Sequence, residues 1–258
     1  MNIVAIHGLK GGVGTTTVVS NLAAAINAQS QPVLAIDLCA QNSLRLHFGM
    51  ALQNENGFAS QIAHHRPWHE AGYQSYNGVN FLPFGQDQNN HCIDAINLYV
   101  RNHPNWLDNW LSTLDMPENT WILLDCPLNP SPFHRAALEI ADISLLIVNP
   151  EMLSYTSLHA PNRSRHLYLN AEQNQLMLLN RYCPSIELEK DITSLIKTDF
   201  AASLLPITIH RDEHLREAFA FKKSVIDTAP ASQSAQDFSL AAFWLTARQA
   251  KLAQQRAE

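Results

Sequence analysis

The residues with the clearest capacity for chemistry lie near the start of the chain, where positions 8–17 read GLKGGVGTTT. A short apolar run precedes this segment and a helical pattern follows it, so we expect a strand, a glycine turn and a helix N-terminus. In such a turn, backbone N–H groups and the positive end of the helix dipole converge on an anion. Gly11, Gly12 and Gly14 tolerate positive φ and leave room for a phosphate close to the backbone. The segment therefore predicts a phosphate-binding loop.

The side chains of this loop depart at two positions from the common pattern G-x-x-x-x-G-K-[ST]. Leu9 stands where the first glycine would be, and Thr15 stands where the lysine would be. Lys10 supplies a cation earlier in the loop, and Thr16 falls at the position whose hydroxyl ligates Mg²⁺. The loop thus keeps its metal-ligating hydroxyl and lacks the lysine that would contact the phosphates.

Two apolar runs further along the chain end in a carboxylate. Asp37 follows Val33–Ile36, and Asp125 follows Trp121–Leu124. Ligands of an open α/β sheet bind at the carboxyl ends of its strands. A carboxylate there can hold Mg²⁺, usually through a water molecule, because Mg²⁺ gives up its hydration shell reluctantly. We therefore predict Thr16 and Asp125 as the magnesium ligands and a catalytic role for Asp37 and Asp125.

Alternating apolar runs and helical patterns predict an α/β fold, a doubly wound and mainly parallel sheet flanked by helices. At 258 residues, the chain is expected to form one domain over residues 1–258. Strands are predicted at Ile3–Ile6, Val33–Ile36, Asn80–Phe84, Trp121–Leu124, Ile143–Val148, Gln175–Leu179 and Leu204–Ile209. Helices are predicted at Thr16–Ala28, Ser43–Phe48, 90–114 with a break at Pro104, Phe133–Ile140, Glu213–Phe221 and Ala235–Gln254. Residues 53–77 show no interpretable pattern.

The composition excludes several classes of protein. The net charge of −6, from 17 basic and 23 acidic residues, disfavours a general binder of nucleic acid or anionic membranes. The first residues lack the features of a signal peptide, and no run approaches the roughly 20 apolar residues of a membrane span. The four cysteines show no C-x-x-C spacing, which favours reduced thiols. We expect a cytoplasmic protein.

The loop residues Lys10–Gly14, which read KGGVG, resemble the deviant Walker A box of the MinD/ParA ATPases. The resemblance implies a P-loop NTPase fold with ATP and Mg²⁺ as cofactors. It also implies a homodimer across ATP, in which Lys10 acts as a catalytic residue by reaching the nucleotide of the partner. The nucleotide-binding residues that it implies are Lys10, Gly11, Gly12, Val13, Gly14, Thr15, Thr16, Thr17, Asn180, Arg181 and Pro206.

Three of these residues lie near the expected sheet edge, far from the loop in sequence. Asn180 and Arg181 match an asparagine–arginine pair of the family, in which the asparagine amide reads the adenine edge. An asparagine that only caps a strand end is an equally weighted alternative. Pro206, followed by His210-Arg211-Asp212, resembles the loop that closes over the base and carries dimer contacts.

Two departures from the family concern ATP hydrolysis. Thr15 removes a full positive charge that would neutralise the β- and γ-phosphates. Cys39 replaces the second aspartate of a D-x-D-P-Q motif, and a thiol does not position water as a carboxylate does. Removing one transition-state charge contact typically costs about 10²–10³-fold in rate. The sequence therefore predicts an ATP-binding switch with weak or no hydrolysis, and it leaves open whether the chain is an enzyme.

Thr15, Cys39 and the stretches 81–86 and 205–213 are similar to the branch of the family encoded in bacterial cellulose-synthesis operons. This resemblance implies a role in regulating or localising the cellulose synthase and secretion complex. It implies a small BcsR-like partner protein, other synthase subunits, and recruitment to the inner face of the inner membrane without direct membrane insertion.

Three other functions stay open at this point. A ParA-type partition ATPase would bind DNA through a basic surface, for which Arg163, Arg165 and Arg181 are the candidates, although the acidic total disfavours nucleic acid. A MinD-like protein would cycle on and off membranes. A scaffold would have lost nucleotide binding, which the intact glycines, Thr16 and Asp125 disfavour.

Overall fold

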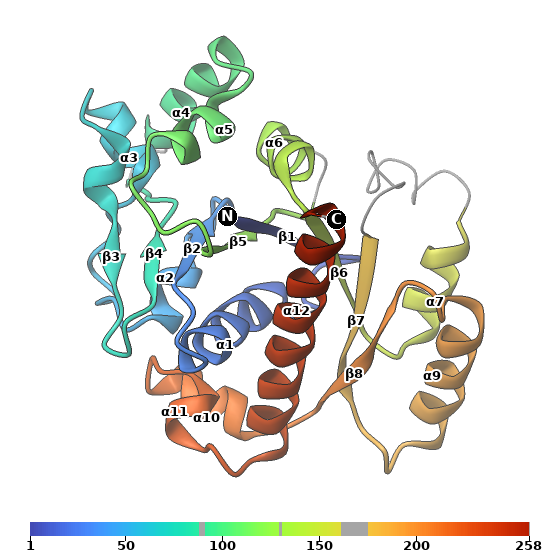
Figure 1. Cartoon of the computed structure of the whole chain (residues 1–258). Coiled ribbons are helices and arrows are strands. Elements are labelled where there is room, and N and C mark those ends of the chain that lie inside the picture. The colour runs from blue at the N-terminus through green and yellow to red at the C-terminus, as the bar shows by residue number, and fades with distance from the viewer. Residues whose placement is uncertain (88–90, 129–130, 161–174, 258) are drawn as a thin grey trace.

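The computed structural model describes residues 1–87, 91–128, 131–160 and 175–257 (Figure 1). Within these residues the strands form one eight-stranded sheet in the order β3-β4-β2-β5-β1-β6-β7-β8. All neighbouring strands are parallel except β3 and β4. The strands are β1 (Asn2–Gly8), β2 (Val33–Asp37), β3 (Tyr73–Gln74), β4 (Asn80–Leu82), β5 (Trp121–Asp125), β6 (Ile143–Val148), β7 (Gln175–Tyr182) and β8 (Leu204–His210). The predicted mainly parallel sheet is confirmed.

Helices cover both faces of the sheet (Figure 1). One face carries α1, α10, α11 and α12, and the other carries α3 to α6 over one half and α7 and α9 over the other half. The helices are α1 (Thr15–Ala28), α2 (Leu44–His47), α3 (Phe58–Ala63), the 3₁₀ helix η1 (Trp68–Ala71), α4 (His91–Asn102), α5 (Trp106–Ser112), α6 (Pro132–Ile140), α7 (Met152–His159), α9 (Glu187–Asp199), α10 (His214–Ala220), α11 (Val225–Thr228) and α12 (Gln233–Ala257).

The central strands are buried on both sides, which explains their continuous apolar sequences. Ile6 belongs to the same buried cluster as Leu22 of α1 and Phe238 of α12. The preceding residue, Ala5, belongs to the cluster on the opposite face, together with Trp106 of α5. Successive side chains of a strand point to opposite faces, so both sets must be apolar when helices cover both faces.

The structure extends or adds elements where the sequence pattern was weak. β7 continues beyond the predicted Gln175–Leu179 and includes Asn180 and Arg181. Neither α7 nor α9 was predicted. The uninterpreted stretch 53–77 contains α3, η1 and β3, which are too short to show a clear periodicity. Pro83 follows the last residue of β4, as expected for a proline at a strand end.

The described helices were also compared with the requirements of a membrane span. Among residues 1–87, 91–128, 131–160 and 175–257, no helix combines the length and the apolarity needed to cross a bilayer.

A close contact between two glycines fixes the start of α3. The N–H groups of Phe58 and Ala59 donate to the carbonyl oxygens of residues 83 and 84, at 3.0 and 2.8 Å. A Cβ atom on Gly57 would lie 2.2 Å from the backbone nitrogen of Gly85. Because that neighbour is backbone, a side chain at position 57 would force the segment that follows β4 away from α3.

We expect Gly57→Ala to lower the free energy of unfolding by about 3 kcal/mol, the upper range for overpacking. Urea denaturation measures this change. Gly72→Ala is the matched control, because its Cβ would lie 3.2 Å from the carbonyl oxygen of His69 and needs only a small adjustment. Equal stability of the two variants would show that the contact of Gly57 with Gly85 does not constrain the fold.

Candidate functional site

The phosphate loop has the predicted order of strand, turn and helix. β1 ends at Gly8 and α1 begins at Thr15. Gly12 and Gly14 adopt positive φ values of 76° and 93°, which glycine reaches without strain. A Cβ atom on Gly8 would lie 2.7 Å from the side chain of Val13, so the loop also needs glycine where it turns back on itself.

The N-terminus of α1 is open toward an anion. Its cap, Gly14, offers no side chain to the first turn, which contains no acidic residue. The first N–H groups of a helix have no intrahelical acceptor, so those of Thr15, Thr16 and Thr17 are available to a ligand. Among the described residues, no heavy atom lies within 4 Å of where a Cβ of Gly12 would be, so this part of the loop is not covered by them.

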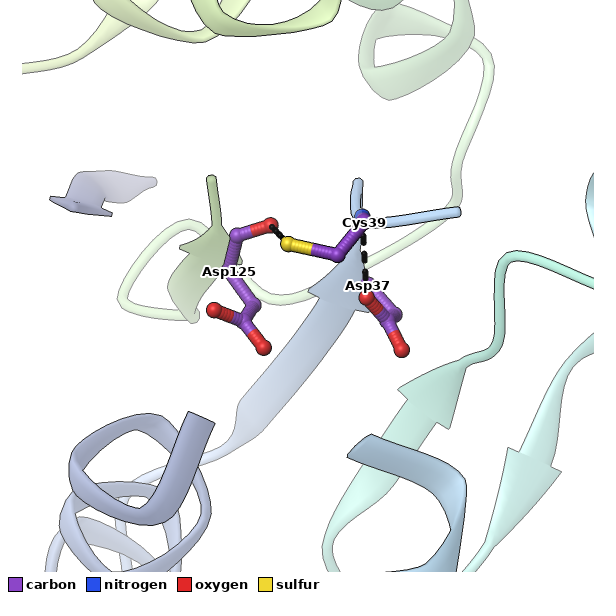
Figure 2. Close-up of side chains that lie close together, drawn as sticks. All are labelled: Asp37, Cys39 and Asp125. Carbon is purple, nitrogen blue, oxygen red and sulfur yellow. Dashed lines mark hydrogen bonds between the residues drawn. The ribbon is translucent and has the colours of Figure 1, made fainter. Parts of the chain in front are cut away.

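The sheet register brings the two predicted carboxylates side by side. Asp37, the last residue of β2, pairs with Asp125, the last residue of β5, and Asp125 also pairs with Ile6 of β1. Both aspartates have no exposed surface. Figure 2 shows their side chains at the ends of the two neighbouring strands, with the sulfur of Cys39 between the strand ends.

The two carboxylates differ in their hydrogen bonds. Asp37 accepts from the backbone N–H of Cys39 at 2.9 Å and from that of Leu44, the first residue of α2, at 3.1 Å. Neither carboxylate oxygen of Asp125 has a hydrogen-bond partner of acceptable geometry among the described residues. One strand-end carboxylate is therefore held by the backbone, and the other is left for a ligand.

Burial sets the protonation of this pair. Burial raises the pKa of Asp37, although the hydrogen bonds from Cys39 and Leu44 and the charge of Arg45 oppose the rise. Burial and then the nearby Asp37 raise the pKa of Asp125, and the Thr16 hydroxyl is near enough to oppose part of this rise. Two adjacent buried carboxylates cannot both ionise without a cation, so the ligand-free pair retains a proton.

Cys39 occupies the place of the family's second aspartate. Its thiol donates to the backbone carbonyl of Asp125 at an Sγ–O distance of 3.5 Å. Burial raises the pKa of this thiol well above its ordinary range, and the charges of Asp125 and Asp37 raise it further. The ligand-free site therefore holds a neutral thiol where a carboxylate would be charged.

These groups surround a cleft of about 670 Å³. The predicted site residues that line it are Lys10, Gly11, Gly12, Gly14, Thr15, Thr16, Thr17, Asp125 and Arg181. Lining residues that the sequence did not indicate as site residues include Gln41, Phe84, Ile93, Asn97, Leu128, Ser131 and Phe133. These residues come from α4, α6 and the turns after β2, β4 and β5. Gln41 falls in the D-x-D-P-Q motif and Phe84 in the stretch 81–86, but neither was predicted to line the site.

Asn180 and Val13, two of the predicted site residues, hold the phosphate loop against the rest of the protein. Asn180 is buried, and its amide nitrogen donates to the backbone carbonyl of Val13 at 2.7 Å. The side chain of Val13 is itself part of the core. A Cβ on Gly14 would lie 2.8 Å from the amide nitrogen of Asn180 and 3.7 Å from Nε of Arg181. The adenine contact of Asn180 stays a prediction, and its amide nitrogen already supports the phosphate loop.

Lys10 forms an ion pair that the sequence did not indicate. Its Nζ lies 3.0 Å from a carboxylate oxygen of Glu151, which follows β6. The hydrogen bond from Lys10 is the main cause that lowers the pKa of Glu151. The two residues are brought together because β1 and β6 are neighbours, with Gly8 paired to Ile147. No sequence pattern marked Glu151.

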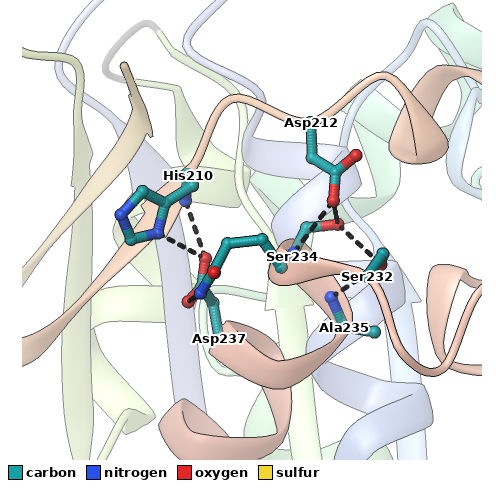
Figure 3. A network of polar contacts seen from close by, with 7 residues as sticks. His210, Asp212, Ser232, Ser234, Ala235 and Asp237 are labelled. Carbon is teal, nitrogen blue, oxygen red and sulfur yellow. Dashed lines mark hydrogen bonds and ion pairs between the residues drawn. The ribbon is translucent and has the colours of Figure 1, made fainter. Parts of the chain in front are cut away.

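Pro206 lies within the edge strand β8 and is not among the described residues that line the cleft. The segment after it is tied to the start of α12 (Figure 3). Asp237 accepts from the backbone N–H and Nδ1 of His210 at 2.8 and 2.9 Å, and Asp212 accepts from the hydroxyl of Ser234 at 2.8 Å. This network fixes where β8 ends. Whether this segment contacts a nucleotide base stays a prediction.

The chain was compared with known proteins. The family described as "Cellulose biosynthesis protein BcsQ" matches residues 1–245. The cellulose biosynthesis protein BcsQ of Escherichia coli strain K12 is 28% identical over 252 residues, which cover 95% of this chain and 94% of that protein.

Solved structures show the same fold. The cell division ATPase MinD of Pyrococcus furiosus has a TM-score of 0.75 and 23% identity, covering 95% of this chain and 98% of its own. The septum site-determining protein MinD of Pyrococcus horikoshii, complexed with Mg-ADP, has a TM-score of 0.71 and 24% identity, covering 94% and 95%.

Replacing Asp125 by asparagine tests how much the buried carboxylate pair lowers the free energy of unfolding of the ligand-free protein. Because the native state raises the pKa of Asp125, it binds more protons than the unfolded state, so stability falls as pH rises above the ordinary carboxyl range. Without ligands, we expect Asp125→Asn to raise the free energy of unfolding by about 1–3 kcal/mol at pH 8. The gain should be smaller at pH 5. Exposed Asp191→Asn should show neither change, and an equal gain at both pH values would contradict the raised pKa.

Proposed function

This chain belongs to the family of cellulose biosynthesis protein BcsQ, as its loop and strand-end residues predicted, and we propose that it is an ATP-binding switch of the bacterial cellulose synthase complex. The observation that carries the proposal is the cleft in which a free helix N-terminus faces an unpartnered buried carboxylate, that of Asp125. The first group suits a phosphate chain and the second suits a cation, and Mg²⁺-ATP supplies both.

Different groups of the cleft would bind the phosphates and the cation. The backbone N–H groups after Gly12 and Gly14 would bind phosphate oxygens, with the helix dipole adding to the attraction. The hydroxyl of Thr16 and the carboxylate of Asp125 would hold Mg²⁺, the latter through water. The cation neutralises phosphate charge when it is bound. Its charge would also allow Asp37 and Asp125 to ionise together, so cation and phosphate binding should support each other.

Two residues of this site favour slow hydrolysis. Thr15 offers a hydroxyl and a backbone N–H where a lysine charge would lie against the phosphates. The neutral thiol of Cys39 points to the backbone carbonyl of Asp125 and has no carboxylate with which to orient water. We therefore propose that the nucleotide-bound state is long-lived and that the protein signals by assembly.

The assembly that we propose is a dimer closed over two nucleotides. Lys10 is part-exposed and would leave Glu151 to reach the phosphates of the partner copy. An ion pair between exposed groups contributes about 0–1 kcal/mol, so this exchange costs little compared with a phosphate contact. The dimer would present a surface to a small BcsR-like protein and other synthase subunits, which would hold it at the inner face of the membrane.

The experiment that tests the proposal measures molar mass by light scattering with Mg²⁺ alone, with ADP and with ATP, and records phosphate release. A dimer that forms only with ATP and releases negligible phosphate would support the switch. A dimer with rapid phosphate release would contradict slow hydrolysis. No response to any nucleotide would overturn the proposal.

We expect Lys10→Ala to remain monomeric at ATP concentrations that convert the wild type to a dimer, because the contact across the interface is lost. Light scattering measures the difference. Lys190→Ala is the matched control, since Lys190 pairs with Glu187 within the exposed surface of α9 and should dimerise normally. ATP-dependent dimerisation of Lys10→Ala would show that this lysine does not act in trans.

Restoring the two missing groups should restore turnover. We expect Thr15→Lys combined with Cys39→Asp to raise the rate of phosphate release by about 10²–10³-fold, the usual value of one transition-state charge contact. Thr15→Lys combined with Cys39→Ser is the control for the carboxylate. An unchanged rate in the Thr15→Lys and Cys39→Asp variant, with ATP binding retained, would mean that other features limit hydrolysis.

A further inference from the structure

The strand-end cluster combines oxygen and sulfur donors. One ligand atom from each of Asp37, Cys39 and Asp125 lies within 4.8 Å of the other two. Figure 2 shows that the three side chains come from the ends of two adjacent strands, with the sulfur between them. An all-oxygen set is what Mg²⁺ prefers, whereas a thiolate selects softer cations such as Zn²⁺ and Co²⁺.

A second observation points to a ligand at this place. Both carboxylate oxygens of Asp125 are buried and lack a hydrogen-bond partner among the described residues, and the side chain has no exposed surface. The ionised form of this buried carboxylate pair is unfavourable without a cation, so a group that supplies positive charge would stabilise it. The cleft gives such a cation an entry path, because Asp125 and Cys39 both line it.

We propose that Asp37, Cys39 and Asp125 form a site for a thiophilic divalent cation, with the Cys39 thiolate as a direct ligand. The thiol proton and the proton retained by the two aspartates pass to solvent as the cation binds. Three protein ligands leave a fourth position open, as in zinc sites that accept a water or a substrate. This inference rests on the proposed function in one respect, since the phosphate oxygens of ATP would fill that position, and the thiophilic cation would then take the place of Mg²⁺ at Asp125.

The three donor atoms must move closer together to share one cation. With bonds of about 2.3 Å to sulfur and 2.0–2.2 Å to oxygen, tetrahedral ligands lie about 3.5 Å apart. Among the described residues the carboxylate of Asp125 accepts no hydrogen bond of acceptable geometry, although the Thr16 hydroxyl lies nearby, and the thiol of Cys39 makes one long bond of 3.5 Å. Asp37 is the fixed point, because two backbone N–H groups orient its carboxylate.

Titration of the reduced full-length chain with Co²⁺ detects the thiolate ligand directly, because a thiolate–Co²⁺ bond absorbs in the near ultraviolet and oxygen ligands do not. We expect a band that saturates at one Co²⁺ per chain and is abolished by Zn²⁺ but not by an equal concentration of Mg²⁺. Cys39→Ser should lack the band and bind Co²⁺ at least about tenfold more weakly. Cys183→Ser, which alters another part-exposed free thiol, should match the wild type.

Three results would overturn the inference: Co²⁺ binding without the band, the same band in Cys39→Ser, or displacement of Co²⁺ by an equal concentration of Mg²⁺. Circular dichroism tests whether each variant is folded. If Cys39→Ser does not fold, the presence or absence of the thiolate band in the wild type still decides whether a thiolate binds the cation. Mg²⁺-ATP binding to the same samples is measured by calorimetry. ATP binding without a thiolate band would remove only this cation site. A thiolate band without ATP binding would remove the proposed function and leave the cation site.

Discussion

The parallel register of the central strands is the constraint on which the site depends. It aligns Asp37 with Asp125 and pairs Asp125 with Ile6 of β1, so the phosphate loop that follows β1 starts next to the carboxylates. Helices cover both faces of these strands, and neither aspartate has exposed surface. A shift of one residue in either strand would turn a carboxylate toward the opposite face of the sheet. The chemistry of the cleft is thus a consequence of sheet geometry.

The ligand-free cleft combines groups that are unfavourable without a ligand. Two buried carboxylates lie side by side, and close to them several N–H groups of α1 lack acceptors. A cation would relieve the first problem and a phosphate chain the second, so each ligand would strengthen the binding of the other. Such a site would trade stability of the empty protein for affinity, in keeping with the proposed control of assembly by a ligand.

Long-range contacts hold the loop in position from its far side. Asn180 of β7 supports the carbonyl of Val13, and Glu151 after β6 pairs with Lys10. Both supports come from strands on the opposite side of β1 from the carboxylates. The loop therefore lies between two sets of strand ends that both contact it.

The sequence by itself determined all the strands except β3, the phosphate loop and the two strand-end carboxylates, because each of these depends on local periodicity and on residue types at short spacing. Only the tertiary structure decided which distant residues meet. Glu151 pairs with Lys10, and Asn180 donates to Val13 from 167 residues away. These contacts depend on strand order and register, which are set by how whole faces pack together. The local sequence around a short polar side chain at the end of an apolar run does not predict which strand will lie next to it.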